Sequence, residues 1–195
     1  MEKKLLEKLY LEDKLSVFQI SKKYQCSQNR INYWLNKFNI KKRTISDSAY
    51  LSHNGIIDPF KVKKLNTQFE WFLMGLGIGL YWGEGNKANK TSVKLGNTDS
   101  DFILCFIKFL KVVYGINENK LKFGLQIFSD INPGIALDFW TNKLKVKETQ
   151  FQKPVVSKIR GNGNYKVKSR YGVLTVYFNN VKLRNIIISE IEKLR

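Results

Sequence analysis

This chain of 195 residues has few of the residues that build disulfide and zinc sites. Its 2 cysteines, Cys26 and Cys105, lie far apart without a CxxC pair, and its 1 histidine is His53. Either kind of site needs several such residues at close spacing, so neither is expected. No secretory leader is expected, because the N-terminus has an amphipathic pattern. The apolar run 71–85 is shorter than the roughly 20 residues that cross a bilayer. A soluble, intracellular protein without a membrane partner is therefore expected.

Acidic residues are also scarce, with 16 Asp and Glu against 34 Lys and Arg and a formal net charge of +18. None lies between Asp13 and Asp47, or between Glu148 and Glu190, and both stretches are rich in lysine and arginine. Charge segregated in this way indicates a polyanionic partner. A membrane surface is the weaker candidate, because no strongly basic helix with a bulky apolar face occurs. Nucleic acid, and double-stranded DNA in particular, is the favoured partner.

Residues 1–44 are predicted to form a small all-α helix-turn-helix module. Ser16 and Gln19 have the spacing of a capping box, which predicts the start of a helix. After a short turn, Ser27 is expected to cap the next helix, which begins at Gln28. Helices joined by such a turn are typical of DNA-binding modules.

In such a module the start of the second helix faces the major groove, where Gln and Asn can pair with adenine and Arg with guanine. The alternative is a solvated face of a three-helix cap, which the flanking basic run makes less favoured. The residues expected to contact DNA are Gln28, Asn29, Arg30, Asn32, Tyr33, Lys41, Lys42 and Arg43. The following segment, 45–66, has no clear period and contains the turn pairs Asn54-Gly55 and Asp58-Pro59, so it is expected to be a tether.

Residues 67–195 show helical and alternating patterns that predict an α+β domain with an antiparallel sheet, covered by helices on one side and basic on the other. The alternation at 120–128 places Leu121, Phe123, Leu125 and Ile127 in the core. A turn at 161–164 predicts a hairpin between strands near 155–160 and 166–178, with a bulge at Gly172. The other expected elements are a helix from Thr67, a strand at 92–96, and helices at 100–113 after Asp99, from Asn132-Pro133 to about 144, and at 181–194.

The helix after Thr67 contains glycines that each cost on the order of 1 kcal/mol relative to alanine. Gly75, Gly79 and Gly83 recur every four residues, so they form one row where another backbone can approach. Its opposite face, with Phe72, Leu76 and Leu80, is expected to face the core. We therefore expect the glycine row to pack against the same helix of a second chain. The alternative is that the glycines are packing detail within one chain.

Glu84 ends this helix, where the partial negative charge of the C-terminus disfavours a carboxylate. Pairing along the glycine rows would also bring two Glu84 side chains together, and like charges resist joint ionisation without a cation between them. A divalent ion that prefers oxygen ligands, such as Mg²⁺, would resolve both problems. The alternative is a solvated residue of the last helical turn.

The stretch Gly77-Ile-Gly-Leu-Tyr-Trp-Gly-Glu-Gly85 resembles the LAGLIDADG motif of homing endonucleases. The match holds at Gly79, Leu80, Glu84 and Gly85, and the chain departs from the motif at Gly77, Ile78, Trp82 and Gly83. The following Asn86-Lys87 and the later Leu95-Gly-Asn-Thr-Asp99 also resemble a compact branch of this family. The resemblance covers 67–195 loosely, and only one copy of the motif is present.

The resemblance implies a site-specific DNA endonuclease that depends on Mg²⁺ or Mn²⁺ and acts as a homodimer through paired motif helices. It implies that Glu84 is catalytic and holds the metal, with the backbone carbonyl of Gly83. Strand phase and resemblance add Gln126, to orient water, and Lys168, to neutralise charge. The alternative within the family is a catalytically inactive transcription regulator or an intron RNA maturase. The further residues expected to contact DNA are Lys94, Lys120, Lys122, Lys158, Lys166 and Arg170.

Overall fold

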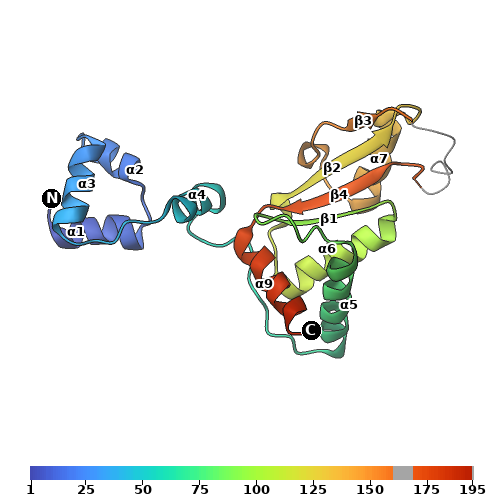
Figure 1. Cartoon of the computed structure of the whole chain (residues 1–195), viewed down its shortest axis with the longest axis horizontal. Helices are drawn as coiled ribbons and strands as arrows, with labels where there is room; N and C mark the ends of the chain where they lie inside the picture. Colours follow the sequence, from blue (N-terminus) through green and yellow to red (C-terminus); the bar gives the residue numbers. More distant parts are fainter. Residues whose placement is uncertain (160–168, 195) are drawn as a thin grey trace. The chain divides into compact units, whose positions relative to one another are not determined.

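The computed structural model describes residues 1–159 and 169–194, and its chain forms two compact units, Met1–Asp58 and Pro59–Arg195 (Figure 1). Each unit has its own hydrophobic core. Lys166, Lys168 and the predicted turn at 161–164 lie outside the described residues.

The first unit is helical. Its elements are α1 (Lys3–Glu7), the π-helical turn η1 (Lys8–Glu12), α2 (Val17–Lys23), α3 (Gln28–Lys37) and α4 (Ile45–Asn54). The predicted capping box of α2 is confirmed, because the Ser16 hydroxyl accepts from Gln19 N at 3.1 Å and the Gln19 side chain accepts from Ser16 N at 2.8 Å. Ser27 caps α3 in the predicted place. The buried hydrophobic side chains of its core are Leu6, Leu9, Tyr10, Ile20, Ile31, Leu35 and Ile40.

The segment expected to be a tether without regular structure contains helix α4. Thr44 and Asp47 form a capping box that starts this helix, and none of the α4 residues is buried. Because no side of α4 is buried, its apolar residues do not recur with a helical period. The sequence pattern therefore did not predict this helix. The end of the same segment is attached to the second unit, where the Lys61 amide donates to Tyr114 O at 2.9 Å and the Lys63 amide to Val113 O at 3.1 Å.

The second unit is built on a sheet with the order β1-β4-β2-β3, formed by β1 (Val93–Asn97), β2 (Leu121–Phe128), β3 (Val155–Ser157) and β4 (Val173–Phe178). The predicted α+β class is confirmed. The predicted antiparallel pairing is confirmed for β1 with β4 and for β2 with β4, but the sheet is mixed because β3 runs parallel to β2. The predicted hairpin of the last two strands is wrong, because β2 lies between β3 and β4. Burial explains the position of the two strands. β4 buries every second side chain and pairs with β1 and β2, so it lies inside the sheet. Val155 and Val156 of β3 are exposed, so β3 lies at the edge.

Helices cover one face of this sheet (Figure 1). The helix starts expected at Asp99 and at Asn132-Pro133 are confirmed for α6 and α7. Gly115 ends α6 with a left-handed backbone. The core lies between these helices and the predicted inward residues of β2. The elements are α5 (Gln68–Glu84), α6 (Ser100–Tyr114), α7 (Pro133–Leu144) and α9 (Val181–Glu192), with the short 3-10 turns η2 (Glu118–Lys120) and η3 (Glu148–Gln150). Among the described residues, no helix has the length and apolarity to cross a bilayer.

Gly77 sets how α5 packs on α6. A Cβ at this position would lie 2.0 Å from a ring carbon of Phe109, so only glycine allows the observed approach. By contrast, a Cβ at Gly79 would meet nothing within 4 Å. The two glycines therefore lie on opposite faces of the same helix.

This difference yields a matched test by alanine substitution. Gly77→Ala should lower the free energy of unfolding by about 1–3 kcal/mol, because the new methyl group overpacks a buried ring. Gly79→Ala should raise it by up to about 1 kcal/mol, because alanine is the better helix former. Urea unfolding, at concentrations where sedimentation shows a monomer, would measure both. Equal effects at the two positions would contradict this orientation of α5.

Candidate active site and nucleic-acid interface

Helix α5 carries the candidate catalytic residue at its last position. Thr67 and Glu70 form the predicted capping box at its start, where Glu70 accepts from the amides of Asn66 and Thr67 at 2.8 and 3.0 Å. These backbone hydrogen bonds lower the pKa of Glu70. At the other end Glu84 is exposed, and no hydrogen bond or ion pair of its side chain occurs among the described residues. The carboxylate is therefore available to a ligand.

The glycine row of α5 faces outward. Built Cβ atoms at Gly75, Gly79 and Gly83 meet nothing within 4 Å, and all three residues are exposed. The prediction that Phe72 faces the core is wrong, because this side chain is 64% exposed and lies on the face of the glycine row. The predicted core positions Leu76 and Leu80 are half-buried. The fully buried positions of α5 are Leu73, Gly77, Ile78 and Tyr81, since contact with Phe109 turns this side inward.

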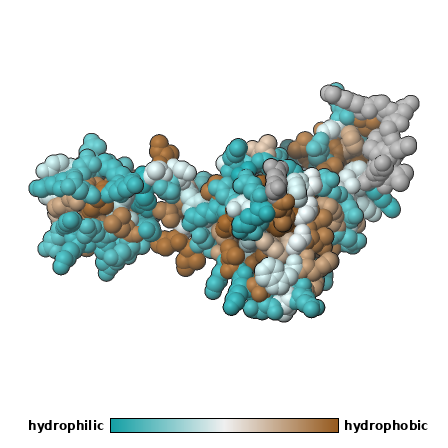
Figure 2. Space-filling model, turned by 60° about the horizontal axis from the view of Figure 1, so that its bottom comes forward, coloured by the Kyte–Doolittle hydropathy of each residue, from teal (hydrophilic) through white to brown (hydrophobic). Residues whose placement is uncertain are grey.

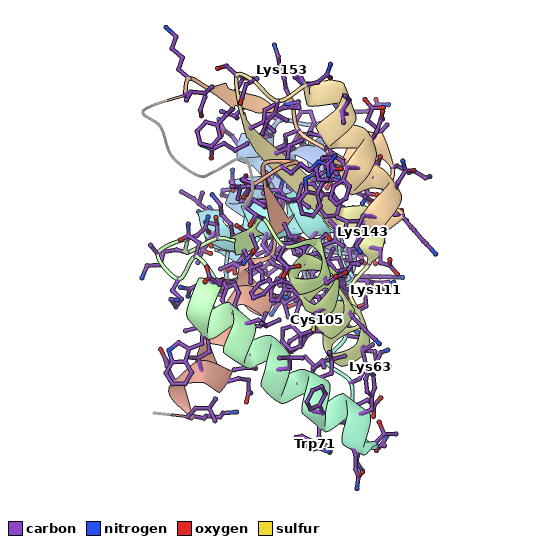
Figure 3. All side chains as sticks on the ribbon, turned by 90° about the vertical axis from the view of Figure 1, so that its right-hand side faces the viewer. Lys63, Trp71, Cys105, Lys111, Lys143 and Lys153 are labelled. Atoms are coloured by element: carbon purple, nitrogen blue, oxygen red, sulfur yellow. The ribbon has the colours of Figure 1, made fainter. Side chains whose placement is uncertain are left out.

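Helix α5 carries exposed aromatic side chains as well as the glycine row, and one of them, Phe69, lies under the ammonium of Lys108 on α6 at 4.7 Å. Phe69, Trp71, Phe72 and Trp82 are all exposed on α5. Trp71 points away from the body of the unit in Figure 3. Hydrophobic and near-neutral residues, brown and white in Figure 2, lie over the part of the unit formed by α5. A surface with such large apolar groups and no charge between Glu70 and Glu84 is typical of a protein–protein contact.

The face of the sheet opposite the helices carries polar and basic side chains. Lys94, Tyr177 and Lys122 lie in one row across β1, β4 and β2, and the Lys94 Nζ lies 5.1 Å from the centre of the Tyr177 ring. The next row, Gly96, Thr175 and Gly124, has only small side chains. Sequence analysis found both lysines and missed Tyr177, although its alternation with the core residues of β4 places it on this face.

Gln126 lies on the same face in the following row, opposite Val173. Its amide donates to the Ser157 hydroxyl at 3.3 Å. Glu84 precedes Gly85, which bridges to Leu95 on β1. Because β1 and β4 both lie between Gly85 and β2, Gln126 lies three strand spacings, or about 14 Å, to the side of Glu84 of the same chain. The structure does not bring these two predicted catalytic residues together within one chain.

The other predicted DNA contacts are dispersed. Lys120 ends η2 before β2, Lys158 follows β3 and is exposed, and Arg170 is exposed beside the ring of Tyr171. Lys166 and the catalytic candidate Lys168 are in the part that the structure leaves undescribed.

The loop after Glu84 is held by hydrogen bonds that sequence analysis did not foresee. The Asn86 amide donates to Lys94 O at 2.8 Å, and the Asn89 side chain accepts from the amides of Thr91 and Ser92 at 2.8 and 2.9 Å. Arg184 of α9 donates to the carbonyls of this loop. One signal could have revealed it: Arg184 has the spacing of the core residues Ile187 and Ile191 in the final helix.

The oxygen atoms at the end of α5 suit a hard divalent cation in type but not in number. One chain offers the Glu84 carboxylate and the backbone carbonyl of Gly83, and Mg²⁺ prefers such oxygen ligands. Within 1–159 and 169–194, no group of three or more His, Cys, Asp or Glu could hold a metal ion. A second Glu84 from another copy, together with phosphate oxygens, would complete the ligand set.

In the first unit, α3 presents the predicted recognition residues to solvent. Gln28, Asn29 and Arg30 are exposed in its first turn, Tyr33 is 57% exposed, and Asn32 is half-buried. Lys41 and Lys42 are exposed after the helix. All of these except Asn32 are exposed to solvent.

Arg43 has a structural role instead. Its guanidinium donates to Lys14 O at 2.8 Å and to Leu15 O, and it stacks 4.3 Å from the centre of the Tyr10 ring. The Tyr10 hydroxyl also accepts from the Arg43 amide at 3.0 Å. Arg43 therefore ties the chain after α3 to the loop before α2.

Comparison with models of protein families, with curated proteins and with solved structures finds no match. The likeness to LAGLIDADG endonucleases thus remains a prediction from the motif residues. Any proposal about function must therefore be argued from the geometry of α5 and of the open face of the sheet.

The structural role of Arg43 is testable against its neighbour. Arg43→Ala should destabilise the first unit by about 2–3 kcal/mol, since hydrogen bonds of a charged group and a ring contact are lost. Lys42→Ala, which removes the same charge from an exposed side chain, should change stability by less than about 0.5 kcal/mol. Thermal unfolding followed by circular dichroism would measure both. Equal melting temperatures would contradict the role assigned to Arg43.

Proposed function

We propose that this protein is a site-specific double-strand DNA endonuclease of the LAGLIDADG type, dependent on Mg²⁺ or Mn²⁺ and active as a homodimer. The observation that carries this proposal is the outward glycine row of α5, which ends at the exposed carboxylate of Glu84. A row without side chains lets two such helices approach closely, so both Glu84 residues would reach one centre.

Exposed aromatic residues support the dimer. Phe72 and Trp71 of α5 have most of their surface in water in one chain. Burying such rings against a second chain is favourable at roughly 25 cal/mol per Å² of apolar surface. Pairing along α5 would remove this surface from water in both chains.

The chemistry follows from the placement of Glu84 and Gly83. The two Glu84 carboxylates, with the Gly83 carbonyls, would hold the metal between the α5 ends. When bound, Mg²⁺ would polarise the scissile phosphate and activate water. Gln126 could orient water at a centre to which more than one chain contributes, and Lys168 remains the candidate for charge neutralisation.

DNA would lie on the open face of the sheet. The row of Lys94, Tyr177 and Lys122 supplies two cations, and the Tyr177 ring lies over Gly124 in the adjacent row. Lys120, Lys158 and Arg170 would extend the contact.

The first unit would lengthen the recognised sequence. We assign 1–44 as a helix-turn-helix module whose α3 enters the major groove with Gln28, Asn29 and Arg30. Residues 45–66 would connect it to the catalytic domain, 67–195.

A second candidate is a regulator or intron RNA maturase that binds nucleic acid without cutting it. The exposed start of α3 and the basic sheet face favour it, because both would serve binding without a carboxylate. Glu84 favours the nuclease, since a pure binder gains nothing from a negative charge that faces phosphate.

Glu84→Gln separates these candidates. In Mg²⁺, the unaltered protein should cut a randomised DNA library at a partly palindromic site. The substitution should abolish cutting yet retain binding, because the amide cannot supply the charge that holds the metal. Sequencing of the cut ends measures the first result, and a gel-shift assay in Ca²⁺ measures the second. Tight, selective binding without cuts in Mg²⁺ or Mn²⁺ would leave the regulator.

Gly79→Leu tests the dimer. The leucine side chain would fill the row where the second α5 must approach, so association in solution or on DNA should fall by more than tenfold. Asn142→Leu, at an exposed position of α7, is the control and should leave association unchanged. Sedimentation velocity with and without DNA would measure it. A Gly79→Leu chain that still pairs as tightly as the control would exclude this interface.

A further inference from the structure

Arg184 is a buried arginine that serves the loop after the candidate catalytic residue. It is 9% exposed. Its Nε donates to Asn89 O at 3.0 Å and one terminal nitrogen to Lys87 O at 2.8 Å, across 95 and 97 residues of sequence. The other terminal nitrogen donates to the Asn185 side chain at 3.1 Å. The guanidinium thus holds two carbonyls of the loop at once.

This arrangement is costly for stability alone. Among the described residues, the hydrogen-bond partners of Arg184 include no carboxylate. A buried cation without an opposite charge is usually less favourable than an apolar side chain. The charge of Arg184 also acts on Tyr81, near the C-terminal end of α5. Burial raises the pKa of the Tyr81 phenol, and the backbone of Lys94 and the positive charge of Arg184 offset part of this rise.

Lys87 is the residue that Arg184 places. Its carbonyl is held by Arg184, and its ammonium donates to Trp82 O at 2.5 Å, in the last turn of α5. Neighbouring hydrogen bonds hold the loop on both sides, from Asn86 to Lys94 O and around the Asn89 side chain. The Lys87 ammonium is therefore kept on the helical turn that also carries Glu84.

We propose that Lys87 is a phosphate-contacting residue of the site at Glu84 and that Arg184 is its positioning residue. This inference rests on the proposed binding of nucleic acid. A lysine loses side-chain entropy when it is ordered, and the folded loop meets that cost before DNA binds. The ammonium has three donors, so it can bind a phosphate oxygen while it keeps or exchanges its bond to Trp82 O.

Salt dependence of DNA binding tests the role of Lys87. The slope of log K against log salt is negative, and each lost phosphate contact reduces its magnitude by about 0.9. The slope would be measured by fluorescence anisotropy on a fixed duplex in Ca²⁺, which permits binding without cleavage. Lys87→Ala should reduce the magnitude of the slope by this amount per chain, and Lys87→Arg should restore the original slope. Lys143→Ala is the control: this lysine lies on helix α7 and pairs with Asp101 at 2.8 Å (Figure 3). It removes the same charge and should leave the slope unchanged.

A double-mutant cycle tests Arg184. Arg184→Met removes the donors with little change of volume. Although residue 184 is buried and away from DNA, this substitution should reduce the magnitude of the salt slope. Lys87→Ala should then change the slope much less than it does in the unaltered chain, because the ammonium is no longer held. Arg184→Lys serves if the methionine variant does not fold, since lysine keeps the charge but lacks the planar fork that holds two carbonyls.

The outcomes separate this inference from the proposed endonuclease. A slope loss specific to Lys87, and non-additive with Arg184, supports the inference even if no DNA is cut. If Lys87→Ala changes only the melting temperature and not the salt slope, the inference about Lys87 is overturned. Cutting that depends on Glu84 would still support the proposed endonuclease in that case. Additive effects of the two residues overturn the positioning role. An unaltered chain that binds no DNA overturns both proposals.

Discussion

The close approach of α5 to α6 at Gly77 is the contact on which the rest of the second unit depends. Phe109 fills the place where any other residue would put its Cβ, so α5 can turn only one side inward. Leu73 and Tyr81 then enter the core, and the glycine row faces solvent. The same rotation puts Glu84 at an exposed helix end next to β1. One glycine thus decides where both the candidate dimer surface and the candidate catalytic group lie.

The excess of positive charge serves two different purposes in this protein. Lys94 lies on the open face of the sheet beside the Tyr177 ring, where a polyanion can reach it. Arg43 and Arg184 instead donate to backbone carbonyls and hold chain segments in place. A planar guanidinium can bind several carbonyls at once, which an ammonium does less well. Net charge alone therefore indicates a nucleic-acid partner but overstates how many cations are free to bind it.

Strand alternation in the sequence located the core side of β2 correctly, because burial of one face imposes a period of two. It did not determine strand order. The turn-forming residues at 161–164 favoured a hairpin, yet β2 lies between β3 and β4. Strand pairing depends on which strands bury the most apolar surface together. The valines of β3 are exposed, so they contribute little to the choice of a partner strand. Helix α4 escaped prediction for a related reason, since a helix that buries nothing leaves no apolar period.

The sequence by itself determined where most helices begin, at Ser16, Ser27, Thr67, Asp99 and Asn132, because a capping side chain bonds to amides two or three residues away. It also determined the motif residue Glu84 and the spacing of the glycine row. Only the tertiary structure decided that Phe72 is exposed with that row, and that Arg184 holds the loop after Glu84. These features depend on contacts between segments such as α9 and the 86–92 loop, 95 residues apart in the case of Arg184 and Asn89. A local sequence pattern cannot predict contacts between segments so far apart, because the packing of the whole core determines which residues are buried together.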